Sequence, residues 1–123
     1  MISLDSYAWI DRLTNGPKAQ AYNLIIDKID PSEIVTSSVV LFEVYKKIKQ
    51  SADEQKALAA VAAIGQTLIV PFDQTIALEA ADYSLTYGLH MADAFVYATA
   101  KHFEAELYTS DEDLKSLKDV IFI

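Results

Sequence analysis

The sequence predicts an α/β protein, with three α/β/α layers around a central, mostly parallel sheet. Short apolar segments alternate with amphipathic helical segments along the whole chain, and this alternation is typical of a parallel sheet covered by helices on both faces. The length of 123 residues and the hydrophobic share of 52% suit one domain with one core. No repeat or linker composition divides the chain, so we expect a single domain over residues 1–123.

The first half of the chain contains two predicted strands and two predicted helices. A strand covers residues 1–4 and ends at Asp5. Pro17 suits the first turn of a helix that continues through AQAYNLIIDKI. A second strand covers residues 34–36, and one of the two serines that follow caps the helix VVLFEVYKKIKQ, whose apolar residues recur at helical spacing.

The second half continues the alternation. The segment ADEQKALAAVAAIG is a helix that ends at Gly65, and TLIV is a buried type of strand. Asp73 is a suitable N-cap for QTIALEAADYSLTYG, which ends at Gly88. A further helix covers Met91–Glu104, and it is followed by the strand AELYT, a turn with a short helix in SDEDLKSLK, and the terminal strand VIFI.

The composition excludes several classes of protein. Without cysteine there is no disulfide framework, no thiol catalysis and no cysteine-type zinc site. No apolar run approaches the roughly 20 residues that cross a bilayer. The segment MISLDSYAWIDRL lacks the basic start of a secretory signal. We therefore expect a cytoplasmic protein that does not enter a membrane.

The net charge of −8 argues against broad electrostatic binding of nucleic acid. This objection weakens if carboxylates cluster around cations. Two divalent ions would change −8 to −4 and reverse the sign of the field where a phosphate would sit. A basic partner protein that covers an acidic surface is a second solution, and net charge alone does not choose between them.

Four acidic residues fall where parallel strands end or the following helices begin. Asp5 follows the first strand, Asp111 follows AELYT by two residues, Glu43 lies one turn into the helix after IVT, and Asp93 lies in the first turn of HMADAFVYATAKHF. Ligand sites of such sheets form at the carboxyl ends of the strands. Four carboxylates in one small volume require cations, and oxygen ligands favour Mg²⁺ or Mn²⁺. Such ions over a phosphodiester can activate water and stabilise the leaving oxygen.

Each acid also has an ordinary structural explanation. Asp5 and Asp111 could simply be turn or cap residues. Glu43 could pair on the helix surface with Lys46 and Lys47, and Asp93 could favour a helix N-terminus. The joint placement of the four at one predicted edge is what favours a shared site.

Four segments together resemble a known family. LDSYAWI, VVLFEVYKKI, MADAFVYATA and LYTSDEDL, in that order and spacing, resemble the PIN domain, and they look like the VapC-type ribonuclease toxins of toxin–antitoxin pairs. The resemblance spans essentially the whole chain. It implies that Asp5, Glu43, Asp93 and Asp111 bind metal, with Asp113 as an additional acid.

The resemblance also assigns supporting roles and shows two departures. Thr109 matches a hydroxyl residue that orients the first-strand aspartate. Apart from the resemblance, Ser6 next to Asp5 could hydrogen-bond within the site or be an ordinary turn hydroxyl. The chain carries FEA at residues 103–105 where relatives often have a glycine turn, and Leu114 where an aromatic residue is common. Both departures concern packing more than chemistry.

The predicted function is a Mg²⁺- or Mn²⁺-dependent endoribonuclease that acts through metal-activated water. The resemblance implies a tRNA or rRNA type of substrate, a homodimer, and an antitoxin whose C-terminal segment crosses the active-site groove. Lys46, Lys47 and Arg12 could contact RNA phosphates, although solvated surface lysines are the simpler interpretation. Trp9, Tyr22 and Tyr45 are expected in the core or an interface.

Two other functions remain as alternatives. One is a non-catalytic PIN-like binding module, against which the full set of acids argues. The other is an aspartyl phosphotransferase, but LDSYAWID lacks the acid two residues after Asp5 that such enzymes use.

Overall fold

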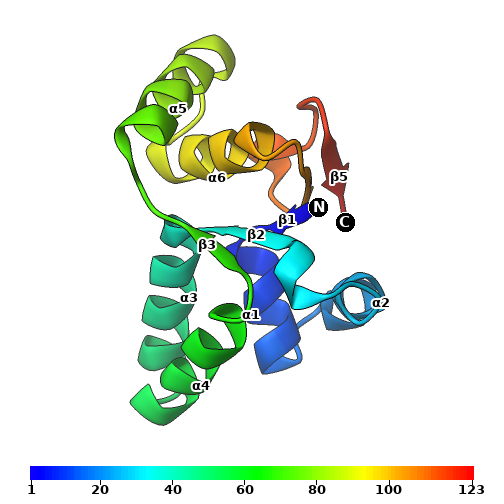
Figure 1. Cartoon of the computed structure of the whole chain (residues 1–123). Coiled ribbons are helices and arrows are strands. Elements are labelled where there is room, and N and C mark those ends of the chain that lie inside the picture. Colours follow the sequence, from blue (N-terminus) through cyan, green and yellow to red (C-terminus); the bar gives the residue numbers. More distant parts are fainter.

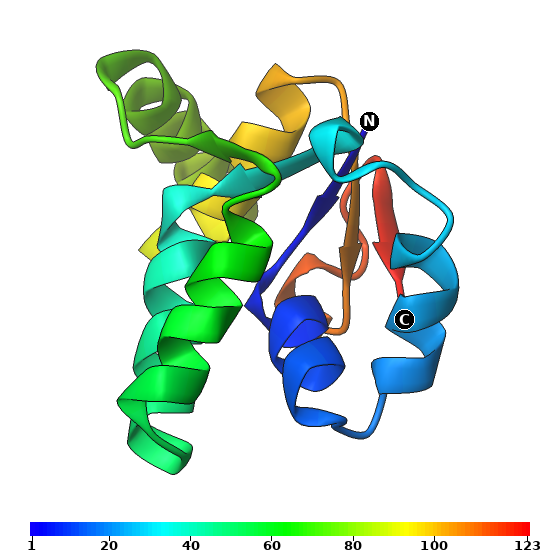
Figure 2. The ribbon, with the colours of Figure 1, turned by 60° about the horizontal axis from the view of Figure 1, so that its bottom comes forward.

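The computed structural model describes all 123 residues and contains one five-stranded sheet in the order β3-β2-β1-β4-β5. All four pairs of neighbouring strands are parallel, and Figure 2 shows β1, β4 and β5 running in one direction. The strands are β1 (Ile2–Leu4), β2 (Ile34–Ser37), β3 (Leu68–Val70), β4 (Glu106–Thr109) and β5 (Val120–Phe122). The predicted parallel sheet is therefore confirmed.

Helices cover both faces of the sheet. They are α1 (Ser6–Thr14), α2 (Ala19–Ile26), α3 (Ser38–Ser51), α4 (Glu54–Ile64), α5 (Gln74–Tyr87) and α6 (Met91–His102). Helices α1 to α4 lie on one side of the sheet, and α5 and α6 lie on the other (Figure 1). The three-layer α/β/α class is thus confirmed. No helix combines the length and apolar character needed to span a membrane.

The strand order explains both the layers and the place of the site. The chain moves outward from β1 to β2 and β3, and right-handed crossovers put the connecting helices on one face. It then returns past β1 to form β4 on the other side, so α5 and α6 cover the opposite face. The order reverses between β1 and β4, and ligands of such sheets bind at this switch point, beyond the carboxyl ends of the strands.

The central strands are the most buried part of the sheet. All residues of β1 and β2 are buried, whereas the edge strands β3 and β5 are partly exposed. Strands covered on both faces need continuous rather than alternating apolar character. Leu4, Val35 and Leu107 meet this need from the three central strands and are fully buried.

Several predicted helix ends are confirmed. Ser37 caps α3 through its side chain, and Asp73 caps α5 by accepting a hydrogen bond from the Ile76 N–H. Gly88 ends α5 with φ +68°, a left-handed conformation that suits glycine.

The structure differs from the prediction at several places. No helix was expected over residues 6–14, where α1 lies. The helix expected from Pro17 through AQAYNLIIDKI begins at Ala19 and ends at Ile26. The strand TLIV was expected to be buried, but β3 is an edge strand in which Leu68 is exposed. The last predicted helix ends at His102 rather than Glu104, because Glu104 adopts φ +54°, which a right-handed helix cannot contain.

Candidate active site

The carboxyl edge of the sheet carries a pocket of about 420 Å³ that contains the four predicted acids. Asp5 follows β1, Asp111 lies just beyond β4, Glu43 lies in α3, and Asp93 lies in the first turn of α6. All four side chains line this pocket. The fold thus brings together residues that are distant in sequence, at the switch point between β1 and β4.

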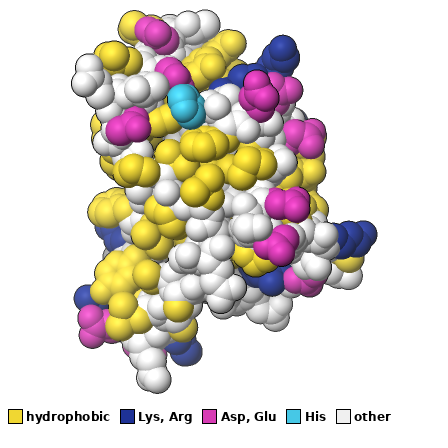
Figure 3. Space-filling view, in the orientation of Figure 1, with side chains coloured by type: hydrophobic (Ala, Val, Ile, Leu, Met, Phe, Trp, Pro, Cys, Tyr) yellow, Lys and Arg dark blue, Asp and Glu magenta, His cyan; other side chains and the backbone are white.

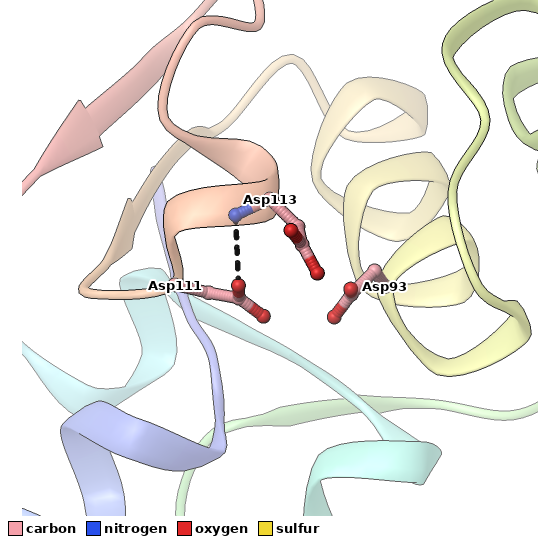
Figure 4. Close-up of side chains that lie close together, drawn as sticks. All are labelled: Asp93, Asp111 and Asp113. Atoms are coloured by element: carbon pink, nitrogen blue, oxygen red, sulfur yellow. Dashed lines mark hydrogen bonds between the residues drawn. The ribbon is translucent and has the colours of Figure 1, made fainter.

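Three carboxylates form a tighter group within this region. Oxygen atoms of Asp93, Asp111 and Asp113 all lie within 4.8 Å of one another. Figure 4 shows these side chains pointing toward a common space from α6 and from the turn after β4. The Asp113 N–H donates a 2.9 Å hydrogen bond to Asp111 Oδ1, so Asp111 also caps the short 3₁₀ turn η2 (Glu112–Leu114). Asp5 and Glu43 lie outside this tight group.

Asp5 is held more firmly than the other acids. It is only 4% exposed, and its Oδ1 accepts a 3.2 Å hydrogen bond from the Ala8 N–H, which caps α1. Its Oδ2 accepts a hydrogen bond from the Thr109 hydroxyl. The cap explanation considered for Asp5 is therefore correct, and it is compatible with a place in the site.

Burial and mutual repulsion raise the pKa values of the acids. Burial raises the pKa of Asp5 to about 6, against the opposing effect of its hydrogen bonds. Burial, followed by the charge of Asp111, raises the pKa of Asp93 to about 7. Burial also raises the pKa of Glu43, which a hydrogen bond from Ser6 partly offsets. Without a counter-charge, the folded protein therefore disfavours full ionisation of the pocket.

The chemistry of this donor set fits a hard divalent cation. The Asp93, Asp111 and Asp113 group offers only carboxylate oxygens, without histidine or cysteine. Oxygen-only sites suit Mg²⁺ or Mn²⁺ rather than zinc. A cation placed there would also relieve the repulsion that raises the pKa of Asp93. This acidic cluster could therefore bind a metal ion.

The basic residues considered in the sequence lie in two different places. Lys46 and Lys47 line the same pocket as the acids. Arg12 lines a separate hollow near the ends of α1, α3 and α4. Its guanidinium is 2.9 Å from the Asp27 carboxylate and donates a 2.7 Å hydrogen bond to Asn23. The structure therefore places Arg12 away from the acidic pocket.

Several residues in or beside the site were not singled out for it from the sequence. The buried Tyr22 was expected in the core, and its hydroxyl also forms a 2.9 Å hydrogen bond with Ser110, next to Asp111. Tyr7 and Phe42 line the acidic pocket. Their positions beside Asp5 and Glu43 in sequence were the available signal, but an aromatic residue in an apolar helix normally indicates core.

The sequence of this chain was compared with models of known protein families. The family model described as PIN domain matches residues 2–120. The chain therefore belongs to the PIN domain family. No curated protein matches the chain.

Solved structures share the whole fold. A toxin–antitoxin complex from Klebsiella pneumoniae superposes with a TM-score of 0.82 at 24% identity, over 98% of this chain and 96% of that chain. VapC20 of Mycobacterium tuberculosis, described as a sarcin–ricin loop cleaving toxin, gives 0.81 at 17% identity, over 94% of each chain. VapBC2 of Rickettsia felis, bound to a promoter DNA fragment, gives 0.76 at 18% identity, over 100% and 98% of the chains.

Proposed function

We propose that this protein is a Mg²⁺- or Mn²⁺-dependent endoribonuclease and the toxin of a toxin–antitoxin pair. The observation that carries the proposal is the group of Asp93, Asp111 and Asp113 oxygens within 4.8 Å of one another, in the region where Asp5 and Glu43 also converge. Membership in the PIN family and the likeness to toxin structures support it.

The chain's own residues would divide the work of the site. Asp93, Asp111 and Asp113 would hold the cation, and Asp5 and Glu43 would complete the negative pocket. A bound divalent cation would neutralise phosphate charge and lower the pKa of water. Thr109 would fix the orientation of Asp5, and Ser6 would fix that of Glu43. Lys46 and Lys47 would contact phosphates beside the one that is cleaved.

The partner and substrate follow from the resemblance and from charge. We propose a tRNA or rRNA substrate, a homodimer of a single-domain chain in the cytoplasm, and an antitoxin that presents a cationic segment to the pocket. The net charge of −8 is complementary to such a segment. VapC20 is described as cleaving the sarcin–ricin loop, which supports ribosomal RNA as a first substrate to assay.

The geometry favours hydrolysis over an aspartyl phosphotransferase. Both Asp5 oxygens already accept hydrogen bonds, from the Ala8 N–H and the Thr109 hydroxyl. A buried carboxylate held in this way is poorly placed to attack phosphorus as a nucleophile.

Cleavage of RNA by purified protein tests the proposal. We expect cleavage in Mg²⁺ or Mn²⁺, its loss in a chelator, and its loss in Asp93→Asn and Asp5→Asn. Asp82→Asn is the matched control, because Asp82 is an exposed acid on α5 outside the pocket. Absence of metal-dependent cleavage, or full activity in Asp93→Asn, would contradict the proposal and favour a non-catalytic binding module.

A further inference from the structure

Two aromatic side chains form an exposed wall beside the acids. Tyr7 is 51% exposed and Phe42 is 62% exposed, and both line the pocket that contains Asp5, Glu43, Asp93 and Asp111. They come from different helices, α1 and α3. Single exposed hydrophobic residues are common on protein surfaces, but these two rings lie beside the acids of one pocket, where a bound substrate could contact them.

Tyr7 closely follows the first of the acids in the chain. It lies in the first turn of α1, two residues after Asp5. Partial burial raises the pKa of its hydroxyl, and the charges of Asp111, Asp5, Asp93 and Glu43 raise it further. Tyr7 and these four acids line the same pocket.

Phe42 begins a row of side chains along α3. Phe42, Lys46 and Gln50 follow one another at intervals of four residues, and all three line the pocket. Four residues of helix advance about 6 Å along the axis, which is close to the length of one extended nucleotide. Lys46 Nζ lies 5.7 Å from the centre of the Phe42 ring. The pocket wall thus carries acids, aromatic rings and cations together.

This combination of side chains matches the chemistry of a single RNA strand. A phosphate belongs at the acidic end with its cations, a base stacks on an aromatic ring, and the next phosphate is attracted by lysine. The pocket, about 420 Å³, falls within the roughly 300–1,000 Å³ of ordinary small-ligand sites. On the face drawn in Figure 3, acidic side chains lie among the Lys and Arg side chains, and no continuous basic surface is visible there. The net charge of −8 also opposes broad electrostatic attraction of RNA, so stacking would supply affinity that general electrostatics do not.

We propose that Phe42 and Tyr7 stack against an unpaired base of the nucleotide next to the cleaved phosphodiester, while Lys46 and Lys47 hold the neighbouring phosphate. This inference rests on the proposed ribonuclease function. It restricts the substrate to RNA segments in which that nucleotide is unpaired, because a base inside a duplex has no free face. It also makes the site tolerant of base identity, since every base has a stacking face.

Fluorescence of 2-aminopurine, which falls when the base stacks, tests the inference directly. A set of short single-stranded RNAs carries 2-aminopurine at successive positions, and each is mixed with the wild-type protein in Mg²⁺ and measured before cleavage proceeds. We expect quenching at one position. Under the same conditions, Phe42→Ala should abolish this quenching and weaken binding roughly 5- to 150-fold, the fold-change that corresponds to losing one stacked base. Phe42→Trp should retain both.

Leu85→Ala is the matched control, because Leu85 is 86% exposed on α5 and lies outside the pocket. It should change neither quenching nor affinity. Thermal melting of each variant verifies folding. Because the Phe42 side chain is largely exposed, its replacement should leave the fold intact.

The outcomes separate this inference from the proposed function. Phe42-dependent quenching by a protein that never cleaves RNA supports the stacking wall and rejects the nuclease. Cleavage with unchanged KM and unchanged quenching in Phe42→Ala and Tyr7→Ala keeps the nuclease and overturns the wall. Loss of dimerisation in Phe42→Ala, measured by light scattering, with RNA affinity unchanged also overturns it, because the rings would then contact protein. Absence of quenching at every RNA position would also overturn the stacking proposal.

Discussion

The hydroxyl of Thr109 donates a hydrogen bond to the carboxylate of Asp5, which lies 104 residues earlier in the chain. The Thr109 hydroxyl oxygen in turn accepts a 2.9 Å hydrogen bond from the Asp111 N–H. One side chain therefore ties the end of β1 to the turn that carries Asp111. Because Thr109 is fully buried, this link is shielded from water and keeps two acids in fixed relative positions.

Thr109→Val should weaken the site without changing the fold. It keeps the shape of the side chain but leaves a buried Asp5 oxygen without its donor, which costs about 1–3 kcal/mol. Loss of such orienting contacts typically lowers metal affinity or activity roughly 10- to 100-fold. Steady-state cleavage rates and Mn²⁺ titrations measure this, with Thr109→Ser as the variant that keeps the hydroxyl. Equal activity in the valine and serine variants would refute the orienting role.

The stability of the metal-free protein should fall as pH rises from about 4 to 7. The folded-state pKa values of Asp5 and Asp93 are raised from 3.8 to about 6 and about 7. The folded state therefore holds protons that the unfolded state has released in this window, and linkage makes the slope of unfolding free energy negative. The contribution is fully present below pH 3.8 and is lost as pH rises through these folded-state values.

Denaturant unfolding in a chelator at a series of pH values measures this effect. Asp93→Asn removes one of the two groups, so its stability should depend less on pH than that of the wild type. After allowance for partial exposure, the difference at neutral pH should be on the order of 1 kcal/mol in favour of the variant. If the unfolding free energies of the two proteins changed with pH in parallel, the pKa of Asp93 would not be raised in the folded protein.

Added Mg²⁺ or Mn²⁺ should stabilise the wild type and leave Asp93→Asn nearly unaffected. A ligand that binds only the folded state, at a concentration of about 100 Kd, adds about 2.7 kcal/mol. Thermal melting with and without the ion measures the shift, and Asp82→Asn should respond like the wild type because Asp82 lies outside the pocket. If the Tm of the wild type were the same with and without the ions, this would argue against a metal centre.

Glu104→Gly should stabilise the protein. Glu104 is exposed and has φ +54°, a conformation that costs an ordinary L-residue about 1–2 kcal/mol and glycine very little. Part of this gain is offset by the greater entropy of glycine in the unfolded chain, so we expect a net increase of about 0.5–1 kcal/mol. Glu104→Ala keeps the strain and should not stabilise. A shift of the urea midpoint in the alanine variant equal to that in the glycine variant would show that the backbone is not the cause.

The alternation of apolar strands and helices was sufficient to predict the parallel sheet and its three layers. The rule that sites form at the carboxyl ends of strands was sufficient to place Asp5 and Asp111 together, because it depends on topology and not on side-chain packing. Helix α1 was not predicted because only Ala8 and Trp9 are buried in it, which gives a weak apolar pattern. Its strongest signal is the Asp5 cap, but the sequence equally allowed Asp5 to be an ordinary turn residue.

Details of the site that depend on side-chain packing could not be predicted from the sequence. Nothing in the local pattern indicates that Tyr22 meets Ser110, 88 residues away. Nor does it indicate that Asp113, rather than Asp5, forms a close group with Asp93 and Asp111. Arg12 was considered for RNA phosphates on the basis of its position after the first strand, but Asp27 and Asn23 hold its guanidinium in the structure.

The most direct test of the account is the position of Mn²⁺ in a crystal, located by its anomalous scattering. The close group of carboxylates predicts a strong anomalous-difference peak among the Asp93, Asp111 and Asp113 side chains. This peak should be absent in crystals of Asp93→Asn. A map without a peak there at saturating Mn²⁺, or with the ion bound only at exposed acids elsewhere, would contradict the metal centre on which the proposed nuclease depends.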